Sequence, residues 1–210
     1  MMRKPNVYLY VFDTMADWEI GYLTPELHSG RYFKKGLAPL EVIAVGMDKR
    51  PVTTMGGLNI LPRLTVEECV LEDTDALILP GGNTWLEAIH EPILQKASQA
   101  LENGAVVAAI CGATLGLAKM GLLDTRRHTS NNLEYMKMTC PKYNGELYYE
   151  MEAAVADGNL VTASGAAPLE FAKQVLEVMD VFEPETLQAW FNLYKTQEPQ
   201  YFFELMHAIK

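Results

Sequence analysis

Short apolar runs alternate with longer amphipathic stretches along most of the chain, an order that indicates strands separated by helices. The apolar runs are rich in β-branched residues, as is typical of buried strands in a parallel sheet. They lie at Val7–Phe12, Leu40–Val45, Ala76–Leu79 and Val106–Ile110. Helices are expected from about Ala16 toward His28, after Pro80-Gly81-Gly82 with a break at Pro92, from Cys111 to Gly121, and over Pro168–Met179.

Two turns with glycine predict β-hairpins, because glycine supplies the positive φ that tight hairpins need. Met55-Gly56-Gly57 would join Val52–Thr54 to Leu58–Leu61, and Asp157-Gly158-Asn159 would join Tyr148–Val155 to Leu160–Ala163. Arg127–Ser130 indicates a brief extended segment. Together these elements predict an α/β fold, a doubly wound and mostly parallel sheet with helices on both faces.

The C-terminal stretch differs from the rest of the chain in its aromatic content. We expect an α/β domain over residues 1–183 and a helical extension over residues 184–210, with two short helices separated near Glu198-Pro199. Its aromatic residues should cover an apolar surface of the same domain or of a partner chain.

Composition narrows the class of protein. The 210 residues carry a formal net charge of −10 and no lysine- or arginine-rich run, which argues against nucleic-acid binding. No apolar run is long enough to span a bilayer, so we expect a soluble protein without a membrane partner. The 3 cysteines form no C-x-x-C pair, which favours a reducing cytoplasm and predicts neither a metal site nor another cofactor.

At Cys111 the sequence changes from residues that favour a strand to residues that favour a helix. A thiol at such a turn faces the free N–H groups of the first helical turn, which favour the thiolate and make the sulfur a nucleophile. The alternative is a passive core thiol, since free cysteine is among the most buried residue types.

Two other turns should lie near Cys111, because the carboxyl ends of neighbouring parallel strands meet in one crevice. The N–H groups of Gly82 and Gly112 could hold the oxyanion formed when sulfur attacks a carbonyl, although Pro80-Gly81-Gly82 is also a common tight turn. Glu19 could share a proton with the thiol, although acidic residues also favour the first turn of helices for electrostatic reasons.

At these residues the chain resembles the ThiJ/PfpI (DJ-one-like) superfamily. The resemblance runs from about Asn6 to Met179. It rests on Glu19, Leu79-Pro80-Gly81-Gly82, Ala108-Ala109-Ile110-Cys111, Leu122-Leu123-Asp124 through Thr129-Ser130, and Thr162-Ala163-Ser164-Gly165. It implies a class I glutamine amidotransferase-like, flavodoxin-like fold, a reactive Cys111 beside the Glu19 carboxyl, oxyanion donors at Gly82 and Gly112, and a homodimer.

The chain departs from the superfamily pattern at two histidine positions. Gly112 stands where peptidase-type members have a histidine, and Asn131 stands where other members have one after the threonine of the segment that follows the cysteine helix. Asn131 and His128 are therefore only auxiliary candidates, and strand alternation should turn His128 to the opposite face. No His-x-Glu pair supports glutamine amidotransfer.

Two functions fit these residues. The first is a cysteine-dependent enzyme with hydrolase, glyoxalase-like or deglycase-like chemistry on a small carbonyl or acyl compound, which asks less of a base than peptide hydrolysis does. The second is a non-enzymatic protein of redox sensing or stress response, in which Cys111 is oxidised to a sulfenate or sulfinate.

Overall fold

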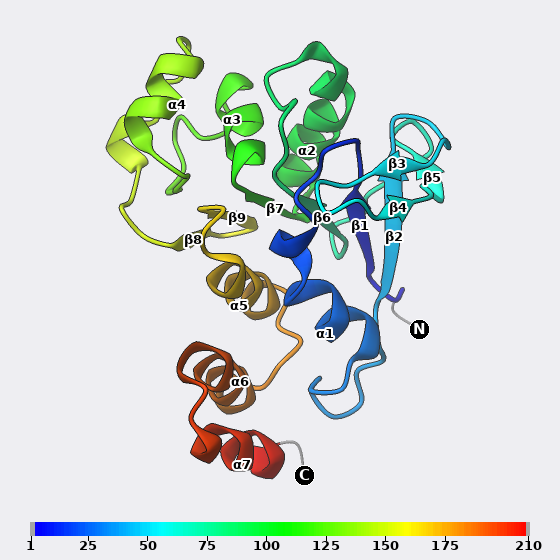
Figure 1. Ribbon diagram of the computed structural model, residues 1–210, viewed down its shortest axis with the longest axis vertical. Helices are drawn as coiled ribbons and strands as arrows, with labels where there is room; N and C mark the ends of the chain where they lie inside the picture. The colour runs from blue at the N-terminus through cyan, green and yellow to red at the C-terminus, as the bar shows by residue number, and fades with distance from the viewer. Residues whose placement is uncertain (1–2, 209–210) are drawn as a thin grey trace.

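The computed structural model describes residues 3–208, and a seven-stranded sheet forms its centre (Figure 1). The strand order is β5-β2-β1-β6-β7-β9-β8, and only β8 runs antiparallel to its neighbour among the pairings of this sheet. The strands are β1 (Asn6–Tyr10), β2 (Glu41–Gly46), β5 (Leu64–Thr65), β6 (Ala76–Leu79), β7 (Val106–Ile110), β8 (Ala154–Asp157) and β9 (Leu160–Ala163). The predicted α/β class and flavodoxin-like arrangement are confirmed.

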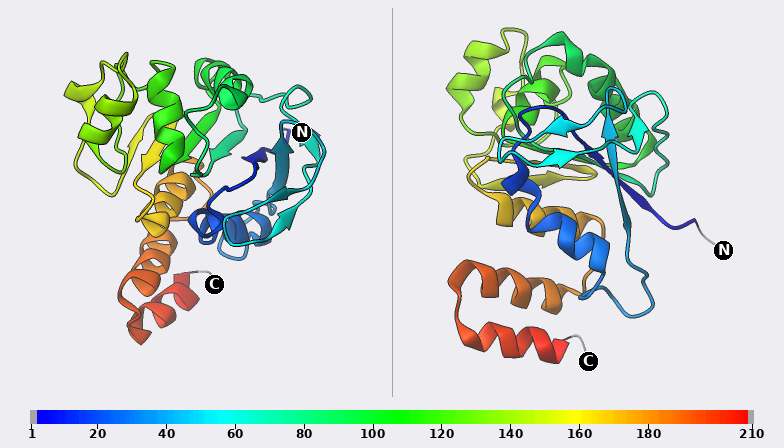
Figure 2. Two further views of the ribbon diagram at one scale, coloured as in Figure 1. Left: turned by 45° about the horizontal axis from the view of Figure 1, so that its top comes forward. Right: turned by 45° about the vertical axis from the view of Figure 1, so that its right-hand side comes forward.

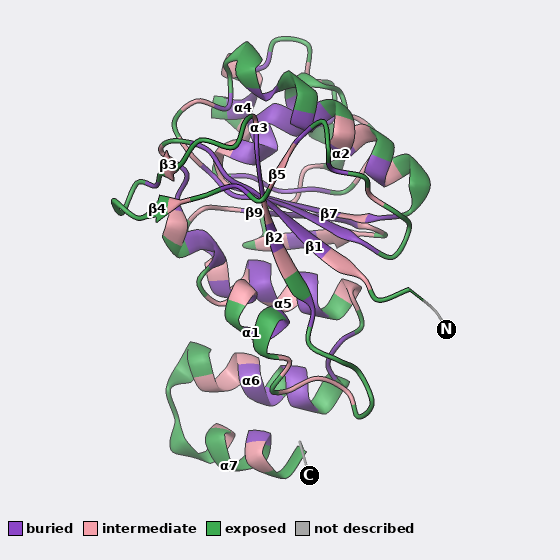
Figure 3. Cartoon of the chain, turned by 90° about the vertical axis from the view of Figure 1, so that its right-hand side faces the viewer, coloured by how far each residue is buried: buried purple, intermediate pink, exposed green. Residues whose placement is uncertain are grey.

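Helices cover both faces of this sheet (Figures 1 and 2). One face carries α2 (Glu91–Asn103), α3 (Gly112–Lys119) and α4 (Leu133–Thr139), and the other carries α1 (Leu23–Ser29) and α5 (Pro168–Val178). Figure 3 shows the strands as the most buried part of the molecule, and every residue of β6 is buried. Two apolar faces of the sheet are thereby removed from water, the main driving force for this architecture.

The helix expected from Ala16 toward His28 is interrupted. A 3₁₀ turn, η1 (Asp17–Ile20), ends where the Gly21 N–H donates to the Trp18 carbonyl at 3.2 Å, and α1 begins only at Leu23. Pro25 explains the new start, because proline has no N–H to bond back to residue 21 and is tolerated only in a first helical turn. Glu19 consequently lies on a short 3₁₀ turn.

The other elements differ from the sequence predictions mainly in length. The first hairpin forms as β3 (Val52–Thr53) and β4 (Asn59–Ile60). Pro92 is the second residue of α2, preceded by the 3₁₀ turn η2 (Ala88–His90), so the expected break is present. The strand expected from Tyr148 begins only at Ala154 after the 3₁₀ turn η3 (Glu146–Tyr148), and Arg127–Ser130 contributes a single β-bridge at His128.

The C-terminal helices form a further layer beyond α5, with α6 (Pro184–Thr196) against α5 and α7 (Pro199–Ala208) against α6 (Figure 2). Trp190 of α6 is fully buried and its indole N–H donates to Glu26 Oε1 at 3.0 Å. Phe202 and Phe203 of α7 remain 47% and 61% exposed, so these two aromatic residues are only partly covered within residues 3–208. None of the helices within residues 3–208 is long and apolar enough to cross a membrane.

His90 is a buried histidine whose two ring nitrogens both hydrogen-bond with neutral hydroxyl groups. Its Nδ1 hydrogen-bonds with the Tyr10 hydroxyl at 2.9 Å, its Nε2 with the Thr84 hydroxyl at 2.8 Å, and its ring stacks on Trp85. Burial lowers the pKa of His90 to about 4, because the imidazolium would lose its hydration.

This depressed pKa predicts acid sensitivity of the fold. An unfolded histidine titrates near pH 6.5, so the His90 contribution to stability is complete above that pH and is lost as the pH falls toward about 4. Urea titrations at a series of pH values should show a loss of about 3 kcal/mol from this residue. The His90→Gln variant should lack this part of the pH dependence, and an unchanged slope in the variant would contradict the assignment.

Candidate active site

Cys111 lies at the turn between β7 and α3, as the sequence predicts, and its backbone is strained. Its φ of 60° and ψ of −125° lie in a region that residues with a side chain rarely adopt. The turn is held because the Cys111 N–H donates to the Ala163 carbonyl at 3.0 Å and the Thr114 hydroxyl donates to the Cys111 carbonyl at 2.6 Å. Such maintained strain is most often found at functional sites.

Glu19 lies beside this cysteine and is completely buried. Its Oε2 accepts the Gly81 N–H at 2.6 Å, whereas its Oε1 is the buried side-chain oxygen without a hydrogen-bond partner of good geometry among residues 3–208. A methyl group placed on Gly165 would stand 2.7 Å from Cys111 Sγ and 3.0 Å from Glu19 Oε1. The thiol and the free oxygen therefore both lie next to Gly165.

Burial controls the protonation of this pair. It raises the pKa of Glu19 above its ordinary value, although the Gly81 N–H acts in the opposite direction. Burial also raises the pKa of the Cys111 thiol, a negative Glu19 raises it further, and donors from Asn131 and Gly112 lower it. Two anions side by side are therefore disfavoured, and the two groups titrate as one coupled unit.

Asn131 contacts the sulfur directly. Its Nδ2 donates to Cys111 Sγ at 3.2 Å, and its Oδ1 accepts the Gly165 N–H at 2.8 Å. The structure thus brings this auxiliary candidate to the thiol together with Gly165, which sequence reasoning did not place in the site. The signal for Gly165 was its position in a turn directly after a predicted strand.

His128 is not brought to the thiol. It is fully buried, with Nδ1 bonded to the Arg126 carbonyl and Nε2 to the Tyr143 hydroxyl, each at 2.7 Å. Burial lowers the pKa of His128, because the imidazolium would lose its hydration. Both ring nitrogens are hydrogen-bonded to groups other than the Cys111 thiol.

Gly82 and Gly112 lie side by side. A methyl group on Gly112 would stand 3.0 Å from the Gly82 carbonyl oxygen and 3.0 Å from the Trp85 ring, so neither backbone leaves room for a side chain. The Trp85 indole N–H donates to the Pro80 carbonyl at 2.8 Å and fixes the turn that carries Gly82. Within residues 3–208 the Gly82 N–H donates to no protein acceptor, which leaves it free for a ligand oxygen.

The described residues contain no group of three or more histidine, cysteine, aspartate or glutamate side chains that could hold a metal ion. The protein groups that the structure brings to the sulfur include the buried Glu19 carboxyl, the Asn131 amide and the backbone of Gly165.

Comparison with known proteins identifies the family of this chain. A Bacillus subtilis (strain 168) protein named "Uncharacterized protease YoaZ" is 60% identical over 208 residues, covering 99% of both chains. "Deglycase PfpI" of Pyrococcus furiosus is 28% identical over 124 residues, 59% of this chain and 72% of the relative. The crystal structure of a thiJ/pfpI family protein from Bacillus anthracis is 62% identical with a TM-score of 0.97, covering 100% of this chain and 99% of its own. The model of the DJ-1/PfpI family matches residues 5–178, and the chain belongs to this family.

Proposed function

We propose that this protein is a cysteine-dependent enzyme that acts on small, reactive carbonyl or acyl compounds. The observation that carries the proposal is a thiol on a strained strand-to-helix turn beside a buried carboxyl with one free oxygen. Burial raises the pKa of Glu19, which makes its carboxylate a better acceptor for the thiol proton.

The first step would be addition of the sulfur to the carbonyl. Proton transfer from the thiol to the Glu19 carboxylate leaves a thiolate and a carboxylic acid. Cys111 Sγ then forms a bond to the carbonyl carbon, and the π electron pair moves to the oxygen. The N–H groups of Gly82 and Gly112 stabilise this oxyanion, and the Glu19 proton passes to it to give a neutral hemithioacetal.

Carbonyl addition suits these residues better than peptide hydrolysis. An amine leaving group must be protonated as it departs, commonly by an imidazole, but Gly112 follows the cysteine and Asn131 has no titratable proton. A relative named as a deglycase supports carbonyl chemistry, whereas the name of the Bacillus subtilis relative points to proteolysis. We also propose that the protein works as a homodimer in a reducing cytoplasm, where its 3 free cysteines stay reduced.

Turnover of methylglyoxal, of an acyl ester and of a peptide by purified protein tests this proposal. Wild type and Cys140→Ser should consume the carbonyl compound at similar rates, because Cys140 is 4% exposed and its thiol contacts the Leu115 carbonyl. Cys111→Ser should be inactive. The proposal fails if wild type is no faster than Cys111→Ser on all three substrates.

Turnover combined with peroxide treatment distinguishes this enzyme from the second candidate, a redox-responsive protein. The donors from Asn131 and Gly112 favour a negative charge at sulfur and would also stabilise a sulfinate formed by peroxide. Selective conversion of Cys111 to a sulfinate by peroxide, seen by mass spectrometry in a protein without turnover, would establish that candidate instead.

A further inference from the structure

Asn131 is held at both ends of its amide group. On one side Oδ1 accepts the Gly165 N–H at 2.8 Å and the Ser164 hydroxyl at 3.4 Å, and on the other Nδ2 donates to Cys111 Sγ at 3.2 Å. A backbone N–H can only donate, so the amide oxygen must face Gly165. This contact fixes the orientation of the side chain and directs an N–H at the sulfur.

The groups around the sulfur are therefore of two kinds: hydrogen-bond donors and one titratable carboxyl. The Gly165 backbone lies against it, the Gly112 N–H and Asn131 donate hydrogen bonds to it, and Glu19 is the titratable group that acts on it. An N–H donor stabilises a thiolate more than a thiol, because hydrogen bonds to charged groups are the stronger ones. Unlike an imidazole, an amide cannot take up the thiol proton.

We propose that Asn131 sets the position of the proton shared by Cys111 and Glu19, favouring thiolate and carboxylic acid over thiol and carboxylate. In this exchange the S–H bond breaks and an O–H bond forms on Glu19, so the charge of the pair is unchanged and no other reactant is needed. This role rests on the proposed reactivity of Cys111 and adds a donor residue to it. It gives a Cys111 thiolate a side-chain donor at a site where no histidine follows the cysteine.

The rate of Cys111 alkylation by iodoacetamide as a function of pH tests the role. Asn131→Ala should raise the alkylation midpoint by about one pH unit and slow the reaction near neutral pH by roughly 10-fold, since a hydrogen bond to a charged group is lost. Asn131→Asp is the second variant, because its carboxylate can still accept the Gly165 N–H but cannot donate to sulfur. It should raise the midpoint at least as far.

Asn132→Ala is the matched control. Asn132 is the same residue type one position along, and its side chain caps α4 by accepting the Tyr135 N–H at 2.8 Å. Its loss should lower stability by an amount typical of a helix cap and leave the midpoint at the wild-type value. Mass spectrometry of the peptide that contains Cys111 confines the measurement to this thiol.

Each outcome has a distinct meaning. Midpoints of Asn131→Ala and Asn131→Asp equal to that of wild type would overturn the role of Asn131 while leaving Cys111 reactive. If wild-type Cys111 is alkylated no faster than the buried Cys69 and Cys140, the proposed function itself fails, and the shared-proton role falls with it.

Discussion

Replacing Gly165 by alanine is expected to slow both carbonyl turnover and alkylation of Cys111 by at least about 100-fold, because misplacement of a reacting atom by roughly 1 Å has that effect. The added methyl group would stand 2.7 Å from Cys111 Sγ, 2.9 Å from its Cβ and 3.0 Å from Glu19 Oε1. The two separations from the Cys111 side chain are shorter than real Cβ contacts, so this side chain must shift away from its position beside Glu19. Rates at several pH values, compared with wild type, measure the effect.

The fold should survive this change. Gly165 is not among the glycines with positive φ, so alanine can adopt its backbone conformation. Gly21→Ala is the control, since Gly21 ends the 3₁₀ turn that carries Glu19 and a methyl group there meets only the Trp18 carbonyl at 3.3 Å. Wild-type rates in Gly165→Ala would show that the thiol and carboxyl need not be in contact.

The part of the site that depends on local pattern was predictable. Cys111 lies where a run of β-branched residues ends and helix-forming residues begin, and neighbouring parallel strands bring Gly82 to the same edge of the sheet. Glu19 was placed correctly near the start of the first helical segment, although that segment proved to be a separate 3₁₀ turn. These features follow from residue preferences over a few positions.

The remaining part depends on contacts between distant segments. Gly165 reaches the sulfur because β9 pairs directly with β7, which places Ile110 opposite Ala163. Strand order between non-consecutive strands is not encoded in local periodicity. Strand alternation already predicted that His128 faces away from the thiol, but its partner, the Tyr143 hydroxyl that bonds Nε2, comes from a distant segment that the sequence did not indicate.

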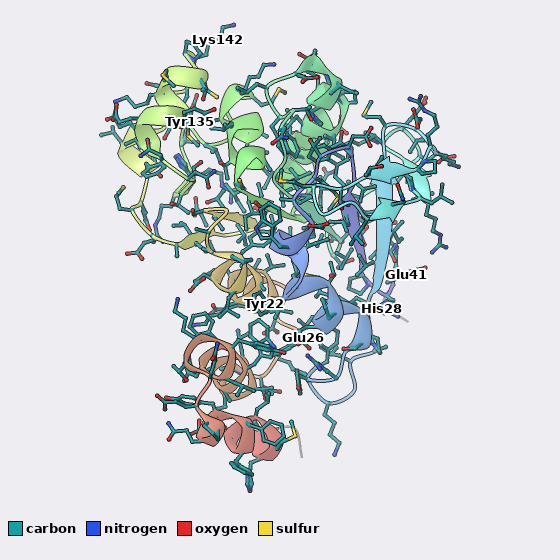
Figure 4. The ribbon with its side chains drawn as sticks, viewed as in Figure 1. Tyr22, Glu26, His28, Glu41, Tyr135 and Lys142 are labelled. Atoms are coloured by element: carbon teal, nitrogen blue, oxygen red, sulfur yellow. The ribbon has the colours of Figure 1, made fainter. Side chains whose placement is uncertain are left out.

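A second strong effect is expected at the junction between α1 and the C-terminal helices. Glu26 of α1, labelled in Figure 4, is 2% exposed and accepts hydrogen bonds from Arg31 Nε at 2.8 Å and from the Trp190 indole N–H at 3.0 Å. Arg31 Nη2 completes a two-pronged ion pair. A carboxylate at this depth must keep a positive partner, because burial of an unpaired charge is costly. Trp190 attaches α6 to the same carboxylate.

Arg31→Met should therefore lower the free energy of unfolding by about 3 kcal/mol in urea titrations at neutral pH, because it leaves the Glu26 charge buried with only the indole N–H. The double variant Glu26→Gln with Arg31→Met should recover most of that loss, since no charge then stays buried. Arg50→Met is the control: Arg50 also forms an ion pair, with Asp48, but its side chain is 85% exposed, and such pairs contribute about 0–1 kcal/mol. Equal losses in Arg31→Met and Arg50→Met would mean that solvent screens Glu26, and that the α1 to α6 contact depends on packing of Trp190 rather than on its buried ion pair.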